Sequence, residues 1–97
     1  MEKRQSILRE AESLVNGARQ KAYGKPQDNF KHISDVVSAL FRKKVTAREV
    51  VLILIVMKLC RHQHSPKRDN NVDAAGYLEI LSRIEYDNIK YGREIGE

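Results

Sequence analysis

Two cations and one carboxylate form a group that could bind an anion. Lys58 and Arg61 are one helical turn apart, on one face of a predicted helix, and they follow the apolar run of residues 50–57. Asp73 comes soon afterwards, beyond a basic connection. Cations beside a buried segment favour an anion as ligand, and phosphate is the first candidate. Two structural alternatives stay open, because Arg61 can complement a helix C-terminus and Lys58 can pair internally with Asp73.

Residues 16–25 supply further side chains that suit a phosphorylated ligand. This segment interleaves three cations with one aromatic residue and two glycines, a combination that can hold phosphate and stack a base. An ordinary basic surface loop has the same composition. The predicted ligand-binding residues are Arg19, Lys21, Tyr23, Lys25, Asn29, Lys58, Arg61 and Asp73.

The common patterns of enzymes and metal sites are missing from the sequence. His32, His62 and His64 lack the spacing of metal ligands, and there is no Walker-type loop, GxGxxG motif or Ser-His-Asp pattern. The sequence therefore predicts neither a metal nor a cofactor. Cys60 is the single cysteine, and its apolar surroundings predict a small buried hydrophobe rather than a nucleophile.

The composition is that of one small, basic, globular domain. The 97 residues are 41% hydrophobic and 32% charged, with a formal net charge of +5 and a pI of about 9.5. This charge favours phosphorylated small molecules, but its spread over several segments does not favour duplex nucleic acid. There is no signal-peptide pattern, and the apolar run is shorter than the roughly 20 residues that span a bilayer. We therefore expect a cytoplasmic protein without a membrane partner.

The first half of the chain carries two helical patterns. Ser6 can cap a first helix that ends near Gly17, and residues 22–26 are expected to form a loop. Asp28 or Asn29 can cap the second helix. Its predicted apolar stripe comprises Phe30, Ile33, Val37, Leu40 and Phe41, and its predicted polar side Lys31, Ser34, Asp35 and Ser38.

The second half carries two more helices. Thr46 and Glu49 form a capping box, which favours a helix over the strand that the β-branched residues after it would allow. Because residues 50–59 are apolar on every side, this helix should be buried all round, at the centre of a bundle or across an oligomer interface. Asp69 or Asn70 is expected to cap the fourth helix.

The predicted fold class is therefore all-α. It is a single domain over residues 1–97, with four main helices and a core at about residues 6–83. Residues 84–97 are expected to form a polar extension, either a short helix or a tail. A chain of this size buries only a modest core, so we also expect a homo-oligomer.

Three segments resemble a small uncharacterised protein family of phages and prophages. They are VNGARQKAYGKPQDNF at residues 15–30, TAREVVLILIVMKLCR at 46–61 and SPKRDNNVDAAGY at 65–77, and the resemblance covers about residues 13–81. The last motif is fairly specific. Through helix order and the final Asp, the family in turn resembles the MazG-like all-α nucleoside triphosphate pyrophosphohydrolases. This resemblance implies a helical core that handles nucleotides.

The chain departs from the pattern of those enzymes. The resemblance implies two acidic pairs, Glu-x-x-Glu and Glu-x-x-Asp, which hold Mg²⁺ and activate water on a polyphosphate. Here Lys58-x-x-Arg61 stands where the first pair is expected, and the second reads Asn70-x-x-Asp73, with one carboxylate missing. Such a site can bind phosphates but is poorly equipped to hydrolyse them. Acids expected in the first loop are replaced by Ala18, Ala22 and Lys25.

Three hypotheses remain open. The cations favour the capture of a nucleotide or cyclic nucleotide without hydrolysis. The resemblance implies a phage-type protein, which would act in the host cytoplasm as a sponge against host immune signalling. The second hypothesis is a Mg²⁺-dependent pyrophosphohydrolase that acts through Asp73, Glu49 and Asp69. The third is an inhibitor or scaffold that binds a host protein through its basic surface. The sequence thus leaves open whether the protein is an enzyme, and favours binding.

Overall fold

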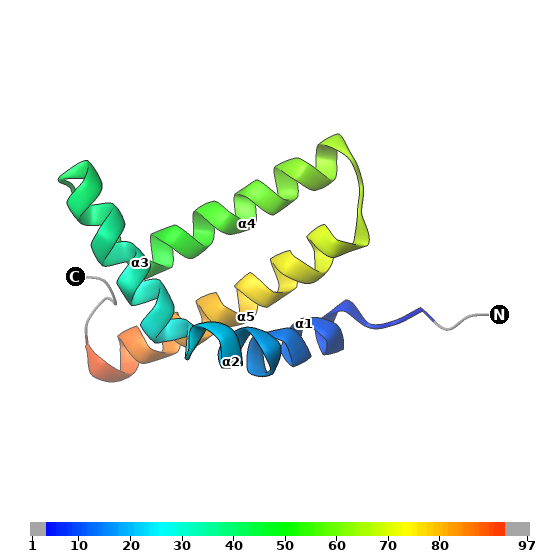
Figure 1. The fold of residues 1–97 in the computed structure, drawn as a ribbon, viewed down its shortest axis with the longest axis horizontal. Coiled ribbons are helices and arrows are strands. Elements are labelled where there is room, and N and C mark those ends of the chain that lie inside the picture. The colour runs from blue at the N-terminus through cyan, green and yellow to red at the C-terminus, as the bar shows by residue number, and fades with distance from the viewer. Residues whose placement is uncertain (1–3, 93–97) are drawn as a thin grey trace.

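The computed structural model describes residues 4–92, and this part of the chain is built from helices without a strand (Figure 1). The predicted all-α fold class is confirmed. None of the described helices is long and apolar enough to cross a membrane. The outer limits of the predicted domain stay predictions, since residues 1–3 and 93–97 lie outside the described part. The four long helices are α1 (Ile7–Asn16), α3 (Pro26–Phe41), α4 (Ala47–His64) and α5 (Arg68–Tyr91), and the short one is α2 (Ala18–Tyr23).

A glycine divides the first helical segment into α1 and α2. Ser6 caps α1 as predicted, by accepting a hydrogen bond from a first-turn backbone amide at 3.4 Å. A Cβ atom at Gly17 would lie 2.7 Å from the backbone oxygen of Ser13, so only glycine fits at this break. The loop predicted at residues 22–26 is shorter than expected, because α2 continues through Tyr23. Two alanines and a glutamine in α2 are good helix formers, which explains the difference.

The next two helices begin with different signals. α3 begins at Pro26, and not after a cap at Asp28 or Asn29 as predicted, because proline suits the first position of a helix. α4 begins with the predicted capping box. The Thr46 hydroxyl accepts from the Glu49 amide at 3.1 Å, and the Glu49 carboxylate accepts from the Thr46 amide at 3.1 Å. The prediction of a helix rather than a strand at residues 50–59 is confirmed.

α5 is longer than predicted at both ends. Lys67 is its N-cap, whereas Asp69 or Asn70 was expected in that role, and Lys67 provides no side-chain capping bond. The helix then continues past Arg83, where the polar extension was expected to begin. No glycine or proline interrupts residues 77–91, and the helix ends at Gly92, whose φ of +64° is left-handed.

The core forms where α4 and α5 pack together and against α1 and α3. Each of these helices contributes a buried apolar side chain: Val15, Phe30, Val51 and Ile84. Ser34 was predicted on a polar surface but is fully buried. Its hydroxyl donates to the backbone oxygen of Lys31 at 2.8 Å, which satisfies the polar group inside the core.

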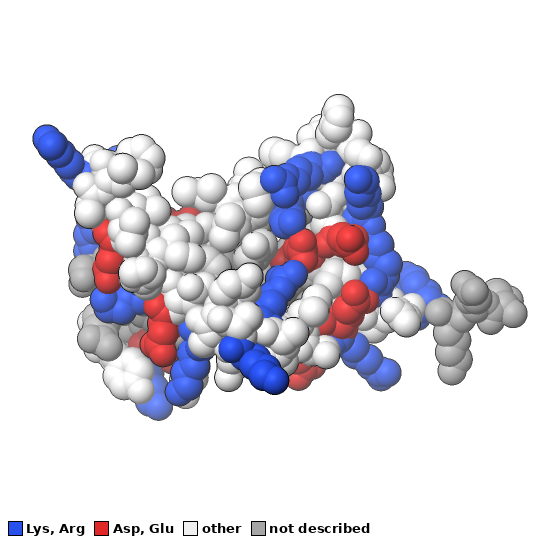
Figure 2. Space-filling view, in the orientation of Figure 1, with Lys and Arg blue, Asp and Glu red and all other residues white. Residues whose placement is uncertain are grey.

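One face of α4 is exposed, so the prediction that this helix is buried on all sides is wrong for the single chain. Ile53, Val56 and Leu59 are 64%, 56% and 58% exposed, and Cys60, predicted to be buried, is exposed beside them. We call these four residues the α4 stripe. In Figure 2, charged side chains are sparse over the middle of α4, whereas acidic and basic side chains both lie along α3. Leu40 and Phe41, which were predicted as core, are also exposed.

Gly76 gives a prediction for stability. A Cβ atom at this buried position of α5 would lie 3.5 Å from a methyl carbon of Val15, which is an ordinary contact. Because glycine in a helix interior costs roughly 0.5–1 kcal/mol relative to alanine, Gly76→Ala should raise the free energy of unfolding by about that amount. Urea unfolding followed by circular dichroism measures this change. Gly17→Ala is the matched control and should destabilise; a loss of stability in Gly76→Ala would contradict the packing.

Candidate functional site

A cavity of about 450 Å³ lies where all five helices converge, and we call it the central cavity. Such a volume is typical of small-molecule sites, in which a mostly apolar wall carries a few polar groups. The polar groups here are Arg19, Gln20, Asn29, Lys58 and Asp73. The buried or half-buried apolar and aromatic part of the wall includes Val15, Phe30, Ile33, Leu54, Tyr77 and Ile80.

Asp73 joins three helices at the wall of this cavity. Its Oδ1 atom accepts a hydrogen bond from Arg19 of α2 at 2.9 Å, and its Oδ2 atom lies 2.7 Å from the Lys58 Nζ atom of α4. The side chains of Lys58 and Asp73 are only 14% and 18% exposed, whereas that of Arg19 is 38% exposed. Lys58 therefore forms the internal ion pair with Asp73 that the sequence allowed, and it also lines the cavity where a ligand could bind.

The ion pairs determine the protonation of Asp73. Burial by itself would raise the pKa of this carboxyl. Hydrogen bonds from Lys58 and Arg19, together with their charges, outweigh burial and hold the pKa of Asp73 below its ordinary value. Asp73 is therefore a carboxylate at neutral pH and a weak base.

The cluster still offers positive charge and hydrogen-bond donors to a ligand. Two cations and one carboxylate leave one net positive charge. A guanidinium has five N–H donors and an ammonium three. Within residues 4–92, Arg19 and Lys58 direct only part of these toward Asp73. An anion that enters from the more exposed Arg19 side can accept from the rest.

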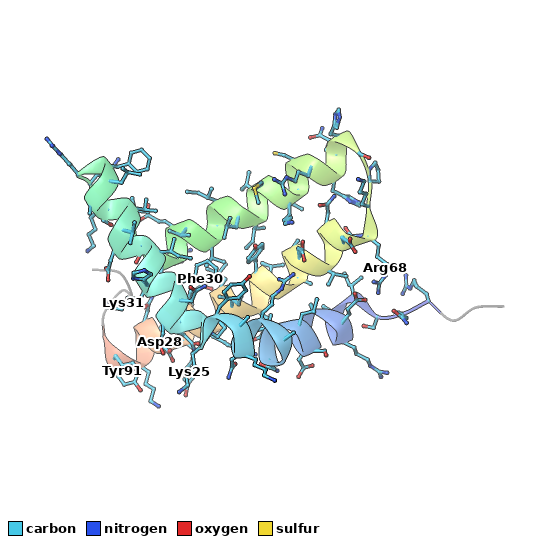
Figure 3. The ribbon with its side chains drawn as sticks, in the orientation of Figure 1. Lys25, Asp28, Phe30, Lys31, Arg68 and Tyr91 are labelled. Carbon is cyan, nitrogen blue, oxygen red and sulfur yellow. The ribbon has the colours of Figure 1, made fainter. Side chains whose placement is uncertain are left out.

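Aromatic side chains form the other functional part of the wall. The rings of Phe30 and Tyr77 pack edge to face, with centroids 6.5 Å apart and planes at 86°. Figure 3 labels Phe30 on the first half of α3, near the crossing with α5. Tyr23 also lines the cavity and is 69% exposed, which places its ring at the rim. These rings offer faces and edges that suit a planar base.

The structure brings most of the predicted ligand-binding residues together. Lys21 and Lys25 are exposed and do not line the central cavity, and Figure 3 shows Lys25 at the outer junction of α2 and α3. Arg61 is one turn from Lys58 but lines a separate hollow at the α4–α5 turn. Those that do line the central cavity are Arg19, Tyr23, Asn29, Lys58 and Asp73.

Within residues 4–92, the other carboxylates predicted for an enzyme do not lie around Asp73. Glu49 is held in the capping box, where hydrogen bonds from the backbone and side chain of Thr46 lower its pKa. It lies nine residues before Lys58 on α4, or about 13 Å along the helix axis. Asp69 is exposed and does not line the cavity. Across the described residues, no group of three or more His, Cys, Asp and Glu could hold a metal ion.

Sequence reasoning missed several residues of this wall. Phe30 was assigned to the core alone, and Gln20 and Tyr77 were not assigned to a site. Tyr77 could have been found, because it follows Asp73 by one helical turn and therefore shares its face. Gln20 carried no comparable signal.

Comparison with known proteins gives a family and two curated relatives. The model of the DUF6378 family, a domain of unknown function, matches residues 6–85. The chain is 38% identical over 81 residues to the Gene 55 protein of Mycobacterium phage D29, and 32% identical over 82 residues to the Gene 55 protein of Mycobacterium phage L5. Each match covers 82% of this chain and 54% and 53% of the respective relative, so the chain spans about half the length of these proteins. No solved structure matches.

Proposed function

The chain belongs to the DUF6378 family of uncharacterised proteins, which has relatives in phages, and we propose that it binds a nucleotide in the central cavity without hydrolysing it. The observation that carries this proposal is the arrangement around Asp73. Two cations from different helices converge on one carboxylate, at the edge of a cavity whose remaining wall is aromatic and apolar apart from Gln20 and Asn29. A nucleotide has the matching division into a charged phosphate and a planar base.

We assign each group of the cavity wall to one part of the nucleotide. Arg19 and Lys58 bind the phosphate with the donors that Asp73 leaves unused. Phe30 and Tyr77 pack against the base, and Tyr23 covers it from the rim. Asn29 offers both a donor and an acceptor to the edge of a base or to a ribose hydroxyl. Asp73 holds the two cations in place before the ligand arrives, which lowers the entropy cost of binding.

The same arrangement argues against hydrolysis. A metal-dependent hydrolase needs free carboxylate oxygens for Mg²⁺ and a base that can accept a proton from water. The carboxylate of the cavity already faces two cations, and its lowered pKa makes it a weak base. Mg²⁺-dependent release of pyrophosphate from nucleoside triphosphates, abolished in Asp73→Asn, would establish instead the hydrolase that a MazG-like core implies.

A phage protein that captures a nucleotide can act as a sponge. We propose that the captured nucleotide is a signal of host immunity, cyclic or linear, in the host cytoplasm. Native mass spectrometry of the protein purified gently from infected or messenger-producing cells tests this role. A retained phosphorylated small molecule is expected, and protein recovered always empty but bound to one host protein would support the inhibitor or scaffold instead.

We further propose that the protein is a homo-oligomer that packs through the α4 stripe. A two-fold axis beside α4 would bury the same apolar residues twice, which suits a stripe without charges. Val56 lies in the middle of the stripe, so Val56→Glu should shift the protein to a smaller species in sedimentation velocity. Leu8→Glu is the matched control on α1, at a residue that is 70% exposed, and should leave the assembly unchanged. A monomeric wild-type protein would contradict this proposal.

A further inference from the structure

A second hollow, of about 570 Å³, lies at the turn between α4 and α5, and we call it the turn hollow. It is separate from the central cavity, with which it shares no lining residue. Figure 2 shows basic and acidic side chains side by side near this end of α4 and α5. The lining residues are Cys60, Arg61, His64, Ser65, Lys67 and Asn70, and none of them is acidic.

The pairing of α4 with α5 explains why this hollow is basic. The two helices run in opposite directions, and Lys58 faces Asp73. One turn further along α4 and one turn back along α5, Arg61 takes the place of Lys58 and Asn70 that of Asp73. Lys58 and Asp73 form an ion pair, but at the next position Arg61 faces the neutral amide of Asn70, where a carboxylate would neutralise its charge. Among the described residues, no carboxylate pairs with Arg61 or Lys67.

Neighbouring charges do not fill this gap. Arg68 forms an ion pair with Glu10 of α1, and Figure 3 shows it where α5 begins, beside the N-terminal end of α1. Its charge is therefore already neutralised. Asp69 is exposed and does not line the hollow. Arg61 and Lys67 thus remain the charges that face it.

Asn70 supplies an independent sign of a ligand. This residue is only 9% exposed, yet its side-chain amide takes part in none of the hydrogen bonds found among the described residues. No described side chain has a fully buried polar atom without a hydrogen bond, so the amide atoms of Asn70 belong to the small part of this residue that solvent reaches. The amide lines the hollow, where it can donate to an oxygen anion. The N-terminus of α5 opens beside it without a side-chain cap. The Asn70 N–H donates to the Lys67 backbone oxygen at 3.0 Å, which leaves the N–H groups of Arg68 and Asp69 for the same anion.

We propose that the turn hollow is a second anion site, which binds a phosphate group. Arg61 and Lys67 supply the positive charge. The Asn70 side-chain amide and the first backbone N–H groups of α5 donate hydrogen bonds to the phosphate oxygens. The phosphate is either free or the distal phosphate of a nucleotide whose base lies in the central cavity. The second source rests on the proposed function, and the first does not.

Asn70→Asp tests the site because it adds the missing carboxylate opposite Arg61. The full chain is titrated with inorganic phosphate at constant ionic strength, and amide shifts are followed by NMR. In the wild type we expect saturable shifts at Arg68, Asp69 and the Asn70 side chain, with affinity at least about tenfold weaker in Asn70→Asp. Asn71→Asp is the matched control, since it adds the same charge at an exposed neighbour that does not line the hollow. Equal phosphate affinity in the two variants, or no saturable shift in the wild type, would overturn the proposal.

Two further variants complete the experiment. Arg61→Gln checks that a loss of binding does not come from misfolding, and Lys58→Met distinguishes free phosphate from the phosphate of a nucleotide. Arg61→Gln changes an exposed side chain, so it should retain the fold and lose phosphate binding; unchanged binding would overturn the proposal. Lys58→Met should leave inorganic phosphate binding at the turn hollow intact. If the phosphate belongs to a nucleotide, a nucleoside triphosphate should shift residues of both cavities in the wild type. In Lys58→Met the shifts at the central cavity should need at least about tenfold more triphosphate, and the turn hollow should respond to the triphosphate only as it does to inorganic phosphate. Phosphate shifts at the turn hollow without nucleotide shifts at the central cavity would support this site and contradict the proposed function.

Discussion

Asp73→Ala is expected to lower the free energy of unfolding by about 2 kcal/mol, which is a large part of the stability of a small domain. The substitution leaves Lys58, which is 14% exposed, without its partner and also disconnects α2 from α5. The expected loss is below that of a fully buried pair because the Arg19 side chain is 38% exposed and its interaction with Asp73 is partly screened by solvent. Urea unfolding at neutral pH measures the change. Asp35→Ala is the matched control: it breaks an exposed pair within α3 and should cost less than about 0.5 kcal/mol.

This stabilisation by Asp73 should also depend on pH with a defined sign. Because the pKa of Asp73 is lower in the folded protein, its contribution is fully present above the ordinary pKa of an aspartate and is lost as the pH falls through the folded value. The difference in stability between wild type and Asp73→Ala should therefore shrink on acidification. A difference that is constant between neutral and strongly acidic pH would contradict the ion-pair assignment.

Lys58→Met is expected to weaken nucleotide binding by at least about tenfold, or about 1.4 kcal/mol. Methionine keeps much of the length of the lysine stem but cannot donate to a phosphate. The loss should fall on the phosphate, so the affinity for the corresponding nucleoside should change little. Calorimetric titration of both ligands measures the two affinities.

The matched control for this substitution is Lys21→Met, which removes the same charge from an exposed position of α2 outside the cavity. It should leave nucleotide affinity within about twofold, apart from a small effect of net charge. Equal losses in the two variants would mean that the protein attracts nucleotides only through its overall positive charge.

The parts of the fold that could be predicted depend on local signals. Ser6, Gly17 and the capping box of Thr46 and Glu49 act within one helical turn, so the sequence shows where α1 ends and α4 begins. The break between α2 and α3 was misjudged because a two-residue connection leaves little trace in composition. The exposed face of α4 could not be predicted either, since the helix is apolar all round and only the packing of α5 and α3 selects the buried side.

The candidate site shows the same division between local and tertiary information. The types and spacing of Lys58 and Asp73 pointed to an ion pair or an anion site, and the structure combines the pair with a cavity wall. The contribution of Arg19 depends on which side of α2 faces Asp73 of α5, which no local pattern encodes. Arg61 was grouped with Lys58 by spacing, but the register of α4 against α5 assigns them to different hollows.

Calorimetric titration of the full chain with a panel of linear and cyclic nucleotides tests the central claim most directly. We expect saturable binding of at least one nucleotide in the absence of Mg²⁺, with the ligand recovered intact afterwards. The NMR shifts of that complex should centre on Arg19, Lys58 and Tyr77. A panel in which no nucleotide binds, or in which the bound nucleotide is recovered as hydrolysis products, would contradict capture at the central cavity.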